Sequence, residues 1–144
     1  MAQRLHLLTG KNPYGDKFPQ FTNELIREVD AMLGIVNTND RKNYDDVFKL
    51  DIKLMEIEDE ISEDFVNKYL LHFIAYVGEI LITETNGHWV MDFDKEAEVW
   101  EPNIKMRENK VVIVPWVYDG VFNDEVPSLS SVCYIFLNPP KLSK

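Results

Sequence analysis

The spacing of apolar residues predicts a helical N-terminal half that follows a loop. Residues 10–20 gather Gly, Pro, Asn and Asp, which interrupt regular hydrogen-bond ladders, so we expect a loop there. Thr22 suits the N-cap of a helix that Gly34 ends, because the apolar residues between them recur at helical spacing. A second helix is predicted at about 43–60, where helical spacing accounts for more apolar residues than strand alternation does.

The dominant element of the sequence is a third helix that runs from Ser62 to about residue 85. Ser62 suits its N-cap, two acidic residues follow in the first turn, and an Asn-Gly pair stops the helix. Apolar side chains are spread around almost its whole circumference. Such a helix has to be covered by other elements on several sides, so we expect it at the centre of the core.

After this helix the pattern changes to short runs that are typical of strands. These runs cover residues 88–93, 98–101 and 110–114. A turn is expected at 107–109, and Pro115 marks a strand end or edge because proline cannot donate to a ladder. Together the runs predict an antiparallel meander of three strands.

The remaining residues favour short helical pieces at about 116–122 and 128–137, ended by Asn138 and two prolines. We therefore predict one α+β domain over 1–144, in which three N-terminal helices pack on one face of the sheet and a short C-terminal helix completes the cover. Its expected parts are an N-terminal loop (1–20), a helical half (21–86), a β meander (87–115) and a helical tail (116–144).

Composition and charge narrow the possible partners. The 144 residues are 45% hydrophobic, which suits one packed core, and 15 basic against 25 acidic residues give a net charge of −10. Such a chain repels nucleic acid.

The N-terminus lacks the apolar core of a secretory signal, so we expect a cytoplasmic protein. The longest near-apolar stretch, 69–82, is too short and too polar for a membrane, so no membrane partner is expected.

A narrow polar seam on the long helix is the first candidate for chemistry. It comprises Lys68, His72, Glu79 and Thr83. His72 and Glu79 could act as a general acid/base pair, assisted by Tyr76 or His88. They lie about 10 Å apart along the helix, so a third group would have to join them. The alternative, which we favour, is that the seam is a solvent edge or that Glu79 caps a neighbouring loop.

A cluster of six carboxylates without a basic residue is the second candidate. It comprises Glu56, Glu58, Asp59, Glu60, Glu63 and Asp64. The spacing lacks the pattern of a calcium loop, and no glycine supplies its turn. The cluster is either an anionic patch for a basic protein partner or a solvated junction between two helices, and we favour the junction.

Other chemistries find little support. The three histidines (His6, His72 and His88) form no metal-binding pair, so no metal is expected. The only cysteine, Cys133, lies in an apolar run where a thiol is inert. No nucleophile elbow surrounds the serines at 128, 130 and 131, and the six glycines form no phosphate-binding loop, so no cofactor is expected. The tryptophans are expected in the core.

Residues 75–81, Ala-Tyr-Val-Gly-Glu-Ile-Leu, followed by Gly-His-Trp at 87–89, resemble a pattern in a family of small bacterial proteins of unknown function. In that family a further strand ends in proline and leads to a helical tail, which 111–115 and 128–136 resemble; the similarity covers 44–137. It implies an α+β domain without an established activity, and some members are suspected to neutralise other proteins. This chain departs from the pattern by a longer acidic insert near 92–101 and a non-basic last helix.

Within this pattern, Gly78, Glu79 and Trp89 are predicted to have structural roles. Gly78 lets another backbone approach the helix, and Glu79 can accept hydrogen bonds from that segment.

For function, the sequence favours a non-catalytic acidic interaction module, immunity-like, that binds a basic protein. The alternatives are a small hydrolase that uses His72 and Glu79, and a homodimeric structural protein, so the chain is either a monomer or a homodimer.

Overall fold

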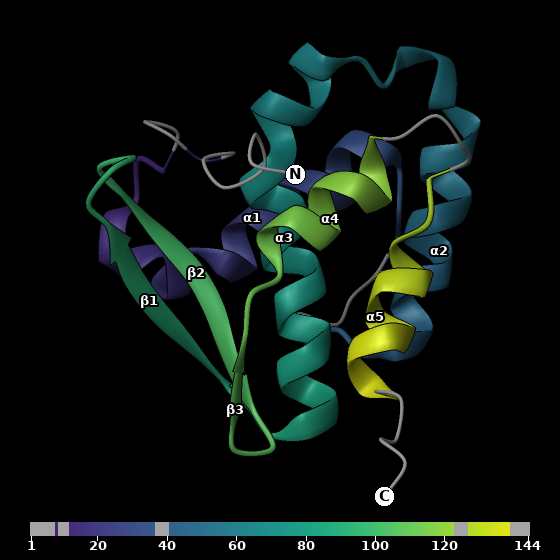
Figure 1. Cartoon of the computed structure of the whole chain (residues 1–144). Coiled ribbons are helices and arrows are strands. Elements are labelled where there is room, and N and C mark those ends of the chain that lie inside the picture. Colours follow the sequence, from purple (N-terminus) through teal and green to yellow (C-terminus); the bar gives the residue numbers. More distant parts are fainter. Residues whose placement is uncertain (1–7, 9–11, 37–40, 123–126, 139–144) are drawn as a thin grey trace, which may run out of the picture.

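Helices on several sides of one long helix and a small sheet at its flank make up the fold (Figure 1). The computed structural model describes residue 8 and residues 12–36, 41–122 and 127–138. In chain order the elements are η2 (Gly15–Gln20), α1 (Thr22–Leu33), α2 (Tyr44–Glu56), η3 (Glu58–Glu60), α3 (Glu63–Thr85), β1 (His88–Asp94), β2 (Val99–Met106), β3 (Asn109–Val111), α4 (Val114–Val121) and α5 (Leu129–Leu137). This arrangement confirms the α+β class predicted from the sequence.

The long helix α3 begins and ends where the sequence predicted. The Ser62 hydroxyl oxygen accepts a hydrogen bond from the backbone N–H of Phe65 at 3.2 Å, and Asn86 ends the helix in the left-handed conformation at φ 57°. Eleven of its residues are buried, from Val66 to Leu81. Burial around most of the circumference explains why the apolar residues of α3 follow no single stripe.

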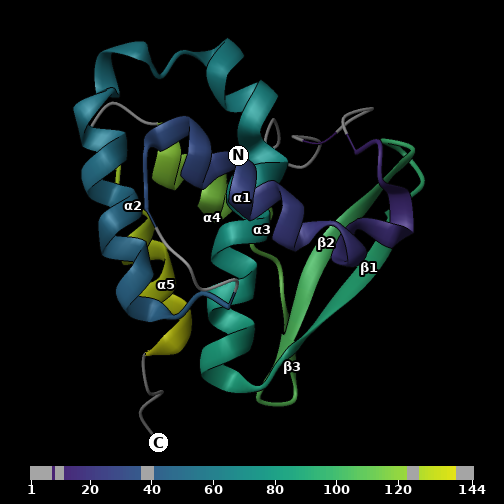
Figure 2. The ribbon, with the colours of Figure 1, turned by 180° about the vertical axis from the view of Figure 1, so that it is seen from behind.

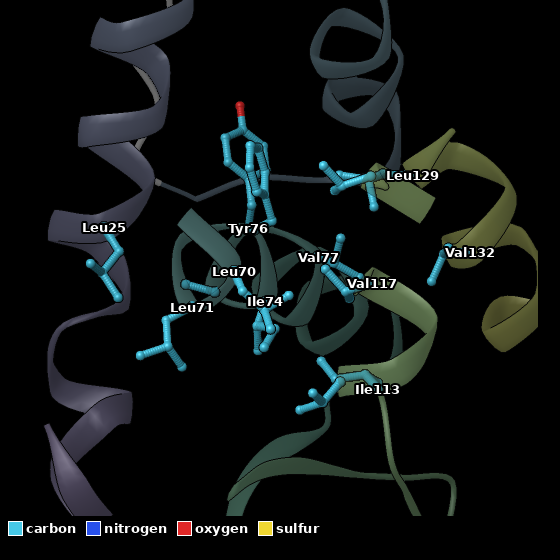
Figure 3. Packing of buried hydrophobic residues seen from close by; sticks show 14 of the residues in the cluster. Leu25, Leu70, Leu71, Ile74, Tyr76, Val77, Ile113, Val117, Leu129 and Val132 are labelled. Atoms are coloured by element: carbon cyan, nitrogen blue, oxygen red, sulfur yellow. The ribbon is translucent and has the colours of Figure 1, made fainter. Parts of the chain in front are cut away.

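Four helices supply the side chains that bury α3. Figure 3 shows Ile74 and Val77 of α3 between Leu25 of α1 on one side and Val117 of α4 and Leu129 of α5 on the other. All five side chains are almost fully buried. The view from behind shows α1 crossing α3, with α2 and α5 side by side at the flank away from the sheet (Figure 2). One continuous core therefore joins the two ends of the described chain.

The sheet is a three-stranded antiparallel meander in the order β1-β2-β3. Trp89 of β1 lies opposite Ile104 of β2, which is fully buried. Contacts to the sheet come from η2, α3 and α4. The expected packing of all three N-terminal helices on the sheet is therefore wrong in part: α2 packs mainly against α3 and α5.

Three local predictions in the N-terminal half need correction. The loop expected at 10–20 contains the 3-10 helix η2, which buries Phe18. Phe21, and not Thr22, is the N-cap of α1: Thr22 is already the first residue of the helix, and its hydroxyl donates a tertiary hydrogen bond described below. The second helix stops at Glu56, and a separate 3-10 turn follows before α3.

The C-terminal half differs from the prediction mainly in boundaries. The second strand extends to Met106 and the third stops at Val111. Pro115 ends no strand: it lies in the first turn of α4, where a missing N–H costs nothing because those N–H groups have no partner within the helix. The two short helices begin and end within about two residues of the prediction.

Candidate functional site

The residues of the polar seam on α3 form separate contacts: Glu79 and His72 bind different partners, and Thr83 accepts from Arg41 Nε at 3.4 Å. One oxygen of the Glu79 carboxylate, Oε2, accepts hydrogen bonds from the Thr22 hydroxyl at 2.8 Å and from the Trp89 indole N–H at 2.8 Å. Glu79 thus joins the start of α1, the middle of α3 and the start of β1. The carboxylate is held by two neutral donors, and this geometry describes a structural junction between three elements.

Gly78 makes this junction possible. A Cβ atom placed there would lie 2.0 Å from the Cη2 atom of Trp89, far inside van der Waals contact. The sequence led us to expect a backbone over this glycine, but the group that approaches is the indole ring. Phe18 of η2 packs edge-on against the same ring, with centroids 5.2 Å apart.

His72 pairs with a different helix. Its Nε2 atom lies 2.7 Å from Glu28 Oε1 of α1, and its Nδ1 atom is buried without a hydrogen-bond partner among the described residues. A small hollow of about 100 Å³ beside it is lined by Tyr14 and Lys68 among others, but not by Glu79. The seam therefore places His72 and Glu79 in different surroundings and brings no third group between them.

Tyr76, the third catalytic candidate, is fully buried. Its hydroxyl donates to Asp30 Oδ1 at 2.7 Å, and Asp30 Oδ2 forms an ion pair with Lys42 Nζ at 2.8 Å. Burial, followed by the hydrogen bond to Asp30, raises the pKa of Tyr76 far above its ordinary value. A phenol in these surroundings stays protonated and serves as a hydrogen-bond donor in the core.

The remaining candidates do not converge on a reactive centre. His88 is exposed at the start of β1, and His6 lies outside the described residues. In the described parts of the chain, no three His, Cys, Asp or Glu side chains are placed to hold a metal ion. Burial raises the pKa of the Cys133 thiol to about 12, with the nearby Asp51 carboxylate as a second cause, so the thiol is uncharged at neutral pH.

The six acidic residues, by contrast, form one exposed surface. They occupy the end of α2, the turn η3 and the first turn of α3, and all six are exposed. Glu63 and Asp64 lie in the first turn of α3, where negative charge is favourable at the positive end of the helix. The others face solvent, apart from a weak ion pair of Glu56 Oε1 with Lys53 Nζ at 3.6 Å.

A hollow of about 320 Å³ borders this acidic surface. Its lining combines five apolar or aromatic residues with three charged ones: Met32, Leu33, Ile57, Phe65 and Tyr69, and Lys53, Glu56 and Glu60. They come from the ends of α1 and α2, the turn around η3 and the start of α3. The acidic cluster is thus a charged rim beside an apolar depression. Sequence reasoning found the carboxylates but missed the depression, because its wall is assembled from three separate helices.

A buried carboxylate, Asp51, and a partly buried one, Asp30, were also missed from the sequence. Asp51 of α2 accepts from the backbone N–H groups of Leu129 at 2.7 Å and Ser130 at 3.1 Å, so it caps α5 from another helix. Its position at the edge of the apolar face of α2 was a usable signal. Asp30, which holds Lys42 and Tyr76, carried none, because its partners are remote in the sequence.

No protein-family model, curated protein or solved structure matches this chain. Its function is therefore inferred from its own geometry.

By length and composition alone, α3 is long and apolar enough to cross a membrane. However, 61% of its most apolar stretch is buried inside the protein, which agrees with the expectation that this helix lies at the centre of the core. Such burial is typical of the central helix of a soluble protein.

Proposed function

We propose that the protein is a non-catalytic, cytoplasmic interaction module that binds a basic protein through the acidic rim and its apolar hollow. The observation that carries this proposal is that two of the six exposed carboxylates, Glu56 and Glu60, line a depression whose other lining residues are apolar or aromatic apart from Lys53. A matching partner segment presents Lys or Arg residues next to a large apolar side chain. The apolar side chain fills the hollow while the cations face the rim.

Charge supports both the choice of partner and the rate of binding. The whole chain carries −10, so its field attracts a basic protein over roughly a Debye length, about 8 Å at physiological salt. Within the hollow, burial of apolar groups such as Phe65 and Met32 supplies the attraction that charge alone lacks. An immunity-like role, in which the module neutralises a basic partner, agrees with the family resemblance in residues 75–89.

The proposal is tested with a short synthetic peptide that contains Lys, Arg and Leu, by fluorescence anisotropy at low and physiological salt. Replacing the rim residues together, Glu58→Gln, Asp59→Asn and Glu60→Gln, should weaken binding about 10-fold, since three exposed charge pairs are lost. Phe65→Ala should also weaken binding, through the hollow. Higher salt should weaken the wild-type complex.

A matched control removes the same number of charges elsewhere, with Asp16→Asn, Glu24→Gln and Glu98→Gln, all of which are exposed. This variant should keep most of the affinity, within about 2-fold of the wild type. Equal losses in the two triple variants would mean that the peptide senses only net charge. That result, or the absence of binding at low salt, would overturn the proposal.

A further inference from the structure

A second surface, on an adjacent side of α2, is apolar and exposed. Phe48, Ile52 and Met55 are 44%, 56% and 49% exposed, and their spacing places them on one stripe of the helix. Tyr134 and Ile135 of α5 are 57% and 40% exposed. The helices α2 and α5 lie side by side (Figures 1 and 2). The two sets are linked through Tyr44, whose ring contacts Phe48 and which lines a hollow together with Tyr134 and Ile135.

A shallow hollow also lies beside the apolar stripe. A hollow of about 410 Å³ between the two helices is lined by Tyr44, Ser130, Ser131, Tyr134 and Ile135. The Tyr44 and Phe48 rings stand edge to face at its margin, with centroids 5.2 Å apart. A contiguous apolar patch of this kind on a soluble protein marks an interaction surface, whereas single exposed apolar residues need no explanation.

The charges beside the apolar stripe indicate which kind of molecule could cover it. At about 100° per residue, Asp45, Lys49 and Glu56 fall on one side of the stripe, and Asp51, which contacts α5, falls on the other. Consider a second copy of α2 laid antiparallel, with a two-fold axis at Ile52. Residue 49 then lies opposite residue 55, so each Lys49 comes within one residue, about 1.5 Å of helix rise, of Glu56 of the second copy.

The same operation also pairs the apolar side chains. Ile52 meets Ile52 of the second copy on the axis, and Phe48 lies within one residue of Met55 of the second copy. The intramolecular partner of Glu56 is Lys53 at 3.6 Å, an exposed pair that is easily exchanged. A single two-fold axis therefore buries the apolar stripe of both copies and forms two opposite-charge pairs. A self-complementary interface has this property.

We propose that two copies of the chain associate through α2 and α5, with the two α2 helices antiparallel about Ile52. This interface is separate from the acidic hollow that is proposed to take the basic partner, although Glu56 borders both. Each copy carries a net charge of −10, so the copies repel one another at low ionic strength. The dimer should therefore strengthen with salt, opposite to the expected behaviour of the basic-peptide complex.

The test is sedimentation velocity of the full chain up to about 500 µM, at about 20 and about 300 mM NaCl. The wild type should dimerise more tightly at the higher salt. Ile52→Glu should raise the dimer dissociation constant at least about 30-fold, because it places two carboxylates together on the axis. Val112→Glu is the matched control: Val112 is 50% exposed outside the patch, and its substitution should leave the constant nearly unchanged.

A charge exchange then tests the geometry. Lys49→Glu alone should weaken the dimer, and Lys49→Glu combined with Glu56→Lys should restore it. A monomer at the highest concentration in both salts, an equal effect of Val112→Glu, or failure of the exchange to restore association would overturn the proposed interface. Ile52→Glu should leave peptide binding intact, so failure of this proposal and failure of the acidic-rim proposal are distinguishable.

Discussion

The contact between Gly78 and Trp89 shows how a single missing side chain can position three elements. The indole of Trp89 lies where a Cβ atom at position 78 would be. Its N–H donates to Glu79, the residue that follows Gly78 in α3. Glu79 also holds Thr22. Truncation of the Trp89, Glu79 or Thr22 side chain would leave either a cavity or an unsatisfied polar group at the junction of α1, α3 and β1.

We expect Gly78→Ala to destabilise the protein by about 2–4 kcal/mol, because the new methyl group displaces the ring and lengthens its hydrogen bond. Urea denaturation followed by tryptophan fluorescence measures this change. Gly34→Ala is the comparison: it meets nothing within 4 Å and bears only the cost of a left-handed residue at φ 72°, about 1 kcal/mol.

A double-mutant cycle identifies the cause. In a Trp89→Leu background the smaller side chain leaves room for the methyl group, so Gly78→Ala should cost clearly less than it does in the wild type. An unchanged cost would place the strain elsewhere in α3.

The residue scale also shows the limit of sequence reasoning. Gly78, Glu79 and Trp89 stood out because a short motif contained all three. Thr22 was assigned to a local cap, yet its hydroxyl donates to Glu79, 57 residues away. The family resemblance stays a prediction. A catalytic role of His72 also stays a prediction, and the contact that His72 makes is with Glu28 of α1.

At the scale of elements, the α-helices were predicted close to their observed limits, whereas the 3-10 helices η2 and η3 were missed. The limits of α3 follow from Ser62 and Asn86, whose conformations are set locally. The 3-10 helix η2 is stabilised by burial of Phe18, a tertiary effect that composition cannot show. Pro115 supports either a strand end or a helix start, and only the packing of α4 on α3 decides between them.

The turn between β2 and β3 offers a test at this scale. Met106 pairs with Asn109, so Arg107 and Glu108 form a two-residue turn, and both have positive φ, at 49° and 72°. Turns of this kind favour glycine at the second position. Glu108→Gly should therefore stabilise the protein by about 0.5–1 kcal/mol in chemical denaturation.

Glu108→Ala is the control for the lost charge. It removes the same carboxylate but keeps the left-handed cost of a side chain, so its stability should stay at or below that of the wild type. A gain as large as that of Glu108→Gly would assign the effect to charge instead of backbone conformation.

At the scale of the whole molecule, net charge is the property that connects stability with binding. The chain carries −10, and its most concentrated acidic surface, at the α2–α3 junction, includes only one ion pair among those described there. Like charges on a compact body repel one another more strongly than they do on an unfolded chain. The acidic rim, which is proposed to bind a basic partner, should therefore weaken the isolated fold.

We expect the melting temperature of the protein to rise by about 2–5 °C between about 10 and about 200 mM NaCl, because salt screens this repulsion. Calorimetry at low protein concentration measures the monomer. The rim variant with Glu58→Gln, Asp59→Asn and Glu60→Gln should start from a higher melting temperature and gain less from salt. A melting temperature independent of salt in both proteins would contradict this account.

The capping of α5 by Asp51 has a consequence for synthesis of the protein on the ribosome. Asp51 emerges early, but the two N–H groups that satisfy it belong to Leu129 and Ser130, and residues of α5 also cover α3. The nascent chain therefore carries an unshielded carboxylate and an open apolar flank until residues 129–137 have left the exit tunnel. The core that joins α2, α3 and α5 is therefore completed only after residues 129–137 have emerged.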